Sequence, residues 1–239
     1  MKKFARIVGT GSYLPPRIIT NSELEKSLDT TDEWITSRTG IKERRIVEDQ
    51  NTCDLALEAS INALEMAELK ASEIDLIILA TTTPDKIFPA TATTLQDRIG
   101  ASCPAFDIQA VCAGFVFALT TAQQYIENGV AENILVVGSE TMSKIVDWND
   151  RSTAVLFGDG AGAVVVSKDN TTGIKHAKLC SDGKYLSSLH VNNNGINETG
   201  TIEMMGNEVY RIAVNRLSDL AEETLKDCNM TSDDLAWMV

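Results

Sequence analysis

The 239-residue chain is 44% hydrophobic and 23% charged, which is typical of a globular protein with a buried core and excludes an intrinsically disordered chain. Its net charge of -13 repels phosphate backbones and anionic lipid headgroups, which excludes nucleic acid and membrane surfaces as default partners. Five cysteines without a CxxC pair give neither a disulfide framework nor a zinc pattern. We therefore expect reduced thiols and a cytoplasmic protein.

Strand-like and helix-like segments alternate along the chain, and this alternation predicts an α/β fold. The apolar runs LIILA and ILVVG are typical of strands that are covered on both faces. The longest apolar run, residues 110–119, is too short to span a bilayer as a helix and predicts buried core. In chain order we expect a strand at 5–8, a helix at 52–69, a strand at 76–81, a helix at 91–99, a strand at 106–108, a helix at 112–128 that Gly129 ends, and strands at 134–138, 154–157 and 163–167.

A weak internal repeat suggests two related halves. A helix leads into SEIDLIILA in the first copy and into SDDLAWMV in the second, so that Asp75 and Leu76 match Asp234 and Leu235. The alternative is a chance match between two short junctions.

The second copy stops on an apolar, strand-like segment at Val239. We therefore expect a chain that is cut short. Residues 1–168 are expected to form the half that carries the chemistry, and residues 169–239 the start of an incomplete second half.

Cys112 is the strongest candidate for a reactive group. The segment CPAFDIQAVCAGFVFALTTAQQYIENG is typical of a short strand, a tight turn and a long helix, with Cys112, Ala113 and Gly114 in the first helical turn. A helix N-terminus carries partial positive charge, which favours a thiolate and stabilises an adjacent oxyanion. The alternative is an unreactive cysteine buried at a helix start. The remaining cysteines are expected to act as small hydrophobic residues, namely Cys53, Cys103, Cys180 and Cys228.

The run GDGAGA at residues 158–163 fits the dinucleotide fingerprint GxGxxG/A in letters only. It leads into the strand-like VVVS, whereas the fingerprint must open a helix, so it predicts a glycine-rich hairpin and no nucleotide cofactor. The two histidines, His176 and His190, stand in no triad pattern, and no spacing is typical of a metal site.

Four segments in the same order resemble the β-ketoacyl-acyl-carrier-protein synthase III family. They are TDEWITSRTGIKERR (31–45), CPAFDIQAVCAGF (103–115), FGDGAGAVV (157–165) and MGNEVY (205–210). The resemblance runs from the amino terminus to Val239 and implies a thiolase-like fold with two duplicated halves in αβαβα layers.

The resemblance also implies a reaction in fatty acid biosynthesis. Cys112 would accept an acetyl or other short acyl group from coenzyme A, which is a substrate, so that no cofactor is needed. The acyl group would then condense with malonyl-acyl carrier protein with loss of carbon dioxide. In the family a histidine and an asparagine stabilise the enolate, and their motifs would follow Val239. We therefore expect this chain to lack the second half-reaction.

Residue by residue, the resemblance implies a grip on coenzyme A by Trp34, Arg38 and Arg151. Trp34 and Arg151 would sandwich the adenine by stacking, and Arg38 would approach the phosphates. Gly206 and Tyr210 resemble residues that line the pantetheine tunnel.

The acyl pocket implied by the resemblance contains Phe88 and Phe157. Phe88 would cross a homodimer interface and close the pocket of the partner. Arg211 resembles part of a small basic face that contacts the acidic carrier protein.

Two alternatives stay open at this point. A biosynthetic thiolase or related acyl-CoA condensing enzyme would share the fold and the nucleophile, but the segments TDEWI and CAGF resemble synthase III more closely. A non-catalytic fragment that binds acyl groups or carrier protein is the other alternative.

Overall fold

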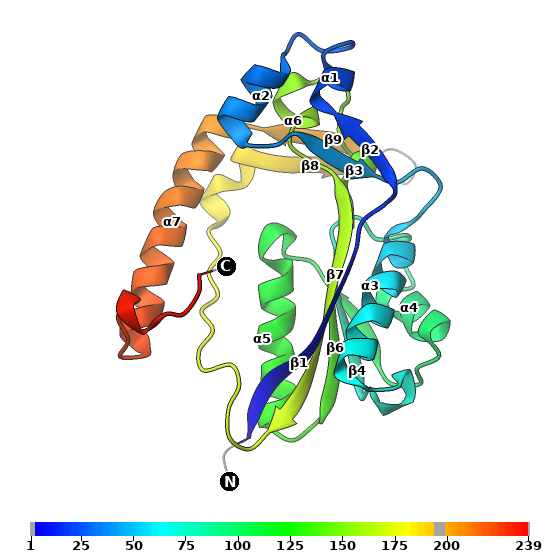
Figure 1. Cartoon of the computed structure of the whole chain (residues 1–239), viewed down its shortest axis with the longest axis vertical. Helices are drawn as coiled ribbons and strands as arrows, with labels where there is room; N and C mark the ends of the chain where they lie inside the picture. The colour runs from blue at the N-terminus through cyan, green and yellow to red at the C-terminus, as the bar shows by residue number, and fades with distance from the viewer. Residues whose placement is uncertain (1–2, 194–198, 239) are drawn as a thin grey trace. The chain divides into compact units, whose positions relative to one another are not determined.

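A five-stranded mixed sheet is the centre of the first unit in the computed structural model, which describes residues 3–193 and 199–238 (Figure 1). The strand order is β1-β7-β6-β4-β5, with β6, β4 and β5 parallel and with β7 antiparallel to both β1 and β6. The strands are β1 (Phe4–Tyr13), β4 (Leu76–Ala80), β5 (Ala105–Ile108), β6 (Asn133–Thr141) and β7 (Asp159–Asp169). The predicted α/β class is confirmed.

Helices cover both faces of this sheet (Figure 1). Helices α3 (Thr52–Ala67) and α4 (Thr91–Ile99) lie on one face, and α5 (Gly114–Glu127) lies on the other. Strand β1 approaches α3 so closely that a Cβ atom at Gly11 would lie 2.2 Å from the carbonyl oxygen of Ala59. Only glycine fits at that position.

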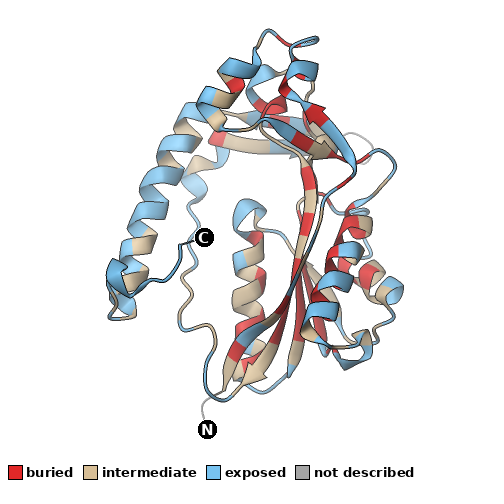
Figure 2. Ribbon diagram, viewed as in Figure 1, coloured by how far each residue is buried: buried red, intermediate tan, exposed pale blue. Residues whose placement is uncertain are grey.

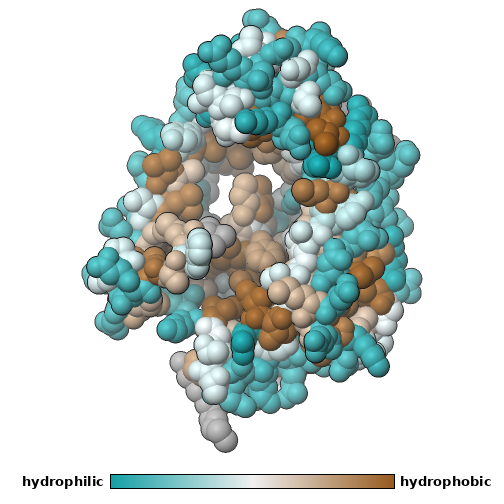
Figure 3. All heavy atoms as spheres, in the orientation of Figure 1, coloured by the Kyte–Doolittle hydropathy of each residue, from teal (hydrophilic) through white to brown (hydrophobic). Residues whose placement is uncertain are grey.

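The two central strands are covered on both faces, as the apolar runs predict. All five residues of β4 are buried, and residues 134–137 of β6 are buried as well (Figure 2). The expected burial of residues 110–119 is wrong, because the sheet covers only one side of α5. Buried positions recur at every fourth residue of that helix, from Gly114 to Ile126, whereas Val116 is exposed. Figure 3 shows hydrophobic residues, coloured brown, at the surface of the molecule.

Two further expectations about local structure are wrong. Residues 154–157 form no strand, because the Asp150 side chain accepts a hydrogen bond from the Ser152 N–H and caps the short helix α6 (Arg151–Ala154). Residues 158–163 form no hairpin. Five of the six belong to β7, which pairs with β1 along one edge and with β6 along the other.

A small two-stranded sheet, β2 (Arg17–Thr20) and β3 (Glu43–Ile46), lies in the chain between β1 and α3, and its two strands are connected through the helices α1 (Asn21–Leu24) and α2 (Asp32–Thr39). Hydrogen bonds from buried Arg44 connect this small sheet to the rest of the unit. The guanidinium donates to the carbonyl oxygens of Ile19 and Val155 and to Oδ1 of Asn21, at 2.9 to 3.2 Å. These bonds tie β2, β3 and α1 to the chain that follows α6.

Contacts between Cα atoms divide the chain into two compact units, Met1–Gly173 and Ile174–Val239. The second unit contains η4 (Gly183–Ser188), the β8–β9 pair (Leu189–Asn193 and Thr199–Met204), α7 (Gly206–Asp227) and η5 (Ser232–Asp234). The expected division into halves at residue 168 stays a prediction. Among the described residues, no helix has both the length and the apolar character needed to cross a bilayer.

The repeated helix-to-strand junction has the same local structure in both units. Glu68 and Asn229 end their helices with positive φ, and the N–H groups of Leu69 and Met230 donate back to residues five positions earlier. A 3₁₀ turn follows in each case, η1 (Ala71–Glu73) and η5, and the last residue of each turn, Glu73 or Asp234, accepts the N–H of the residue before the turn, Lys70 or Thr231. The capping residues show that Asp234 corresponds to Glu73, so the sequence match of Asp234 with Asp75 is displaced by two residues.

Candidate functional site

Cys112 lies in a tight turn between the parallel strand β5 and helix α5. It is the central residue of a 3₁₀ turn, η2 (Val111–Ala113), and it is exposed. The expected helix start at Cys112 is therefore wrong by two residues. The physical reason is that residues 111–113 form a 3₁₀ turn, closed by the Ala113 N–H donating to the carbonyl oxygen of Ala110, and Val111 in this turn has a left-handed φ of 48°. A β-branched residue in this conformation is strained, and strain of this kind is typical of functional turns.

The environments of the remaining cysteines differ from that of Cys112. Burial raises the pKa of the Cys53 thiol, and it also raises the pKa of the half-buried Cys103 thiol. A thiolate is therefore disfavoured at both sites. Cys180 is exposed and Cys228 is half-buried, so the expectation of a small hydrophobic residue is wrong for Cys180. Within the first unit, Cys112 is the exposed thiol.

Three of the residues expected to bind coenzyme A lie together. The guanidinium carbons of Arg38 and Arg151 lie 4.9 and 4.8 Å from the centroid of the Trp34 indole ring. Trp34 and Arg38 share helix α2, and Arg151 opens α6 and donates to the carbonyl oxygen of Asp29 at 2.7 Å. These distances fall in the range of cation–π contacts. An adenine between Trp34 and Arg151 would need roughly 7 Å between the two planes, so Arg151 would have to move away from the indole.

The expected acyl-pocket residues lie in different settings in the first unit. Phe88 is 82% exposed in the loop between β4 and α4, next to Ile87, which is 85% exposed. Phe157 is half-buried in the segment between α6 and β7.

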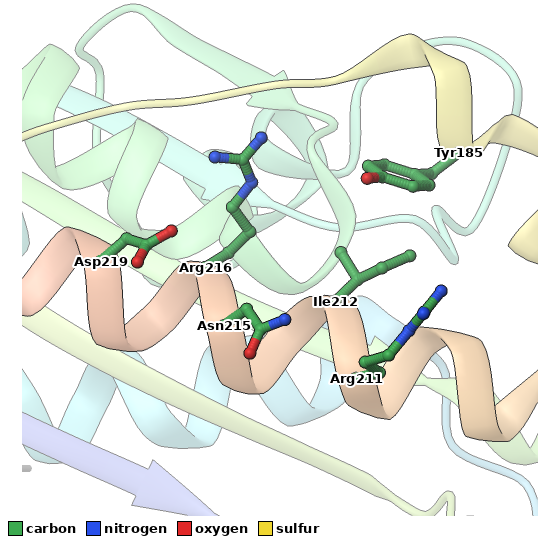
Figure 4. Close-up of a pocket in the computed structure, with 6 residues that line it drawn as sticks. All are labelled: Tyr185, Arg211, Ile212, Asn215, Arg216 and Asp219. Carbon is green, nitrogen blue, oxygen red and sulfur yellow. The ribbon is translucent and has the colours of Figure 1, made fainter.

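The remaining expected site residues belong to the second unit. Gly206 is the first residue of α7, and Tyr210 and Arg211 are exposed on that helix. Arg211 also lines a shallow groove of this unit together with Arg216 and Tyr185 (Figure 4). Arg216 lies 3.7 Å from Asp182, whereas Arg211 has no carboxylate of the described residues within ion-pair distance.

Sequence reasoning missed two groups at the edge of the sheet that carries Cys112. One is the strained Val111, for which an apolar run offers no signal. The other is Glu140 at the end of β6, which accepts hydrogen bonds from three threonines that follow β4. The sequence signal for this contact was the run of three threonines, Thr81 to Thr83, directly after a buried strand, because their hydroxyl groups need hydrogen-bond partners.

Comparisons with known proteins identify this architecture. A family model described as 3-oxoacyl-[acyl-carrier-protein (ACP)] synthase III matches residues 106–183. The chain is 67% identical over all its 239 residues to the β-ketoacyl-[acyl-carrier-protein] synthase III of Vesicomyosocius okutanii and covers 76% of that protein. It is 52% identical to the protein of the same name from Neisseria meningitidis serogroup A, with 99% of this chain and 76% of the relative covered.

A solved structure supports the same assignment. The 3-oxoacyl-[acyl-carrier-protein] synthase III of Aquifex aeolicus superimposes with a TM-score of 0.92 at 44% identity, over 97% of this chain and 74% of that one. The mixed sheet, the helices on both of its faces and this superposition define a thiolase-like α/β fold. The chain belongs to the β-ketoacyl-acyl-carrier-protein synthase III family, and it is therefore a condensing acyltransferase.

Proposed function

We propose that Cys112 is the residue that accepts the acyl group from acetyl-CoA or another short acyl-CoA. The observation that carries this proposal is the exposed thiol in a strained turn at the carboxyl ends of β4 and β5, directly before α5. The Cys112 thiolate attacks the thioester carbonyl, a new carbon–sulfur bond forms, and the bond to the sulfur of coenzyme A breaks. The partial positive charge at the start of α5 favours the negative charge that develops on the carbonyl oxygen.

The experiment that tests this function is to mix the protein with acetyl-CoA and measure its intact mass. A gain of one acetyl group, located on the peptide that contains Cys112, is the expected result. Subsequent addition of malonyl-acyl carrier protein tests the decarboxylating condensation separately. A folded protein that gains no acetyl group would contradict the acyl-transfer proposal.

The proposed binding site for coenzyme A consists of Trp34, Arg38 and Arg151. The indole is a flat apolar surface for the adenine, and the two guanidinium groups beside it are suited to stacking and to phosphate. When the adenine binds, it takes the place of the Arg151 guanidinium on the Trp34 indole. Arg151 then contacts the nucleotide from the other side.

Replacing Trp34 or Arg151 by alanine is expected to raise the KM for acetyl-CoA about tenfold, because each change removes a stacking or cation–π contact of about 1 to 2 kcal/mol. The maximal rate should change much less, because neither side chain touches the thioester. Initial rates over a range of acetyl-CoA concentrations measure both quantities. Arg6→Ala, which removes an exposed ion pair with Asp169, is the control. An unchanged KM in both Trp34→Ala and Arg151→Ala would rule out this grip.

The second half-reaction is the proposed condensation with malonyl-acyl carrier protein, which begins fatty acid synthesis. Arg211 is the proposed contact for the acidic carrier protein, supported by its exposure and by the neighbouring Arg216 in the groove of Figure 4. Gly206 and Tyr210, near the start of the same helix, are proposed to line the path of the pantetheine arm. The thiol and the two thioester substrates supply the chemistry, so no resident cofactor is proposed.

Phe88 and Phe157 are the proposed acyl-pocket residues, with Phe88 contributed to a partner subunit in a homodimer. The support is the exposure of Phe88 and Ile87, since two adjacent large apolar side chains in water are typical of an interface. Sedimentation of the protein is expected to show a dimer that shifts towards monomer in Phe88→Ala. A well-folded monomer at all concentrations would contradict this. A cytoplasmic location is also proposed, in keeping with five free cysteines.

A further inference from the structure

Glu140 joins the carboxyl ends of two parallel strands beside the Cys112 turn. It is the penultimate residue of β6 (Asn133–Thr141), and its side chain reaches the segment Thr81–Thr83 that follows β4. Oε1 accepts from the backbone N–H of Thr82 at 2.8 Å, and Oε2 accepts from the backbone N–H of Thr83 at 3.1 Å. The three threonine hydroxyls donate to the same carboxylate.

This arrangement requires a carboxylate. Each of the two oxygens accepts a backbone N–H, and neither backbone donor can rotate away. A glutamine side chain has one oxygen and one NH₂ group, so either orientation of the amide places a donor against a backbone donor. If the amide oxygen faces Thr83, the N–H of Thr82 loses its acceptor, which is costly. If the oxygen faces Thr82, the N–H of Thr83 keeps only its 3.1 Å contact with Oγ1 of Thr81 and meets the NH₂ group, so in either case the segment would have to shift.

The segment held by Glu140 contacts one end of the Cys112 turn, and the residue directly before that segment lies against the other end. The N–H of Thr81 donates to the carbonyl oxygen of Ile108, the last residue of β5, at 3.1 Å. The preceding residue, Ala80, packs against the start of α5, where a Cβ atom on Gly114 would lie 3.2 Å from the Cβ atom of Ala80. The turn that carries Cys112 runs between these two contacts.

The strain at Val111 explains why such contacts matter. A left-handed valine persists only where the surrounding structure holds it in place. Its side chain is 51% exposed, so its own packing cannot supply all of that restraint. The fixed ends at Ile108 and Gly114 restrain the backbone on both sides of it.

We propose that Glu140 is a positioning residue for acyl transfer, which acts by holding Thr81–Thr83 and through them the turn of Cys112. The proposal rests on the acyl-acceptor role of Cys112 under the proposed function. Glu140 touches neither the thiol nor the acyl group in this scheme. It fixes where the sulfur stands relative to the bound thioester.

Glu140→Gln is the informative variant, because it keeps the size of the side chain and removes one acceptor. The maximal rate of Cys112 acylation by acetyl-CoA is expected to fall roughly ten- to a hundredfold, which is the cost of a small misplacement of a reacting group. The KM for acetyl-CoA should stay within about twofold, because the proposed coenzyme A grip lies on α2 and α6. Hydrogen exchange should increase in peptides that cover residues 81–83 and 108–114.

Asp75→Ala is the matched control. Asp75 also joins β4 and β6, but at the opposite end of the sheet, where one of its oxygens accepts the N–H groups of Glu132 and Asn133 at 2.8 and 2.9 Å. It should lower stability and leave both the acylation rate and the exchange of residues 108–114 unchanged. A Glu140→Gln protein that acylates at the normal rate, or that shows the same exchange pattern as Asp75→Ala, would overturn the proposal.

The exchange measurement separates this proposal from the proposed function. If the unsubstituted protein is not acylated, the acyl-transfer role of Cys112 fails. Exchange in residues 108–114 then still decides whether Glu140 holds the turn: a specific increase in Glu140→Gln supports the restraint, and no increase refutes it.

Discussion

Cys112→Ala is expected to abolish acetylation of the protein by acetyl-CoA. The substitution removes the sulfur that forms the acyl-enzyme bond, and no other nucleophile lies in the strained turn before α5 among the described residues. Loss of a nucleophile costs three orders of magnitude or more in rate, so acetylation should fall by a factor of about 10³ at least. Intact-mass measurements over time after addition of acetyl-CoA give this rate directly.

Cys180→Ala is the matched control for that result. Cys180 is the exposed thiol of the second unit, so it tests whether exposure alone is enough for acetylation. Cys180→Ala should be acetylated at the normal rate. Acetylation that persists in Cys112→Ala, or that is lost in Cys180→Ala, would contradict the assignment of Cys112 as the acyl acceptor.

The sheet and its helices could be predicted from the sequence because their signals are local. The run LIILA is apolar at every position, and only a strand with both faces covered accepts such a run. Helix α3 begins at Thr52, directly after the N-cap residue Asn51, and has an apolar face, so its start follows from a few neighbouring residues. The predicted helix at 91–99 matches α4 for the same kind of reason.

One error came from a local signal that the apolar pattern hid, and the other came from contacts with distant strands. Residues 154–157 are apolar enough for a strand, but Asp150 caps a helix there and β7 begins only at Asp159. The glycines of residues 158–163 suggested a turn, yet β1 and β6 pair with this segment from both sides. Neither partner strand is adjacent in sequence, so a local pattern cannot report the pairing.

The candidate site was reached mainly through resemblance, and the structure shows why spacing alone could not supply it. Trp34 and Arg151 are 117 positions apart and come into contact only through the fold. The same holds for Glu140 and the threonines that follow β4. Cys112 could be singled out locally, but nothing in an apolar run indicates that it is exposed or that Val111 beside it has a left-handed backbone.

Asp159→Asn is expected to be the most destabilising conservative change of a polar residue in the first unit. Asp159 is 5% exposed, and its two oxygens accept different backbone donors. Oδ2 accepts the N–H of Val47 at 2.7 Å, and Oδ1 accepts the N–H of Ser143 at 2.8 Å. An asparagine must turn its NH₂ group towards one of them, which leaves a buried donor unpaired and removes a bond to a charged acceptor. The free energy of unfolding should fall by about 3 kcal/mol, as measured by urea denaturation.

Asp75→Asn makes the same chemical change where the geometry predicts a small effect. Only Oδ2 of Asp75 accepts the N–H groups of Glu132 and Asn133, so an asparagine can keep its oxygen in that place and retain both hydrogen bonds. The carboxylate is also exposed, and its charge contributes little there. The loss should therefore stay below about 1 kcal/mol. Equal losses in the two variants would mean that charge, rather than the number of oxygens that accept backbone donors, decides how firmly these carboxylates hold the sheet.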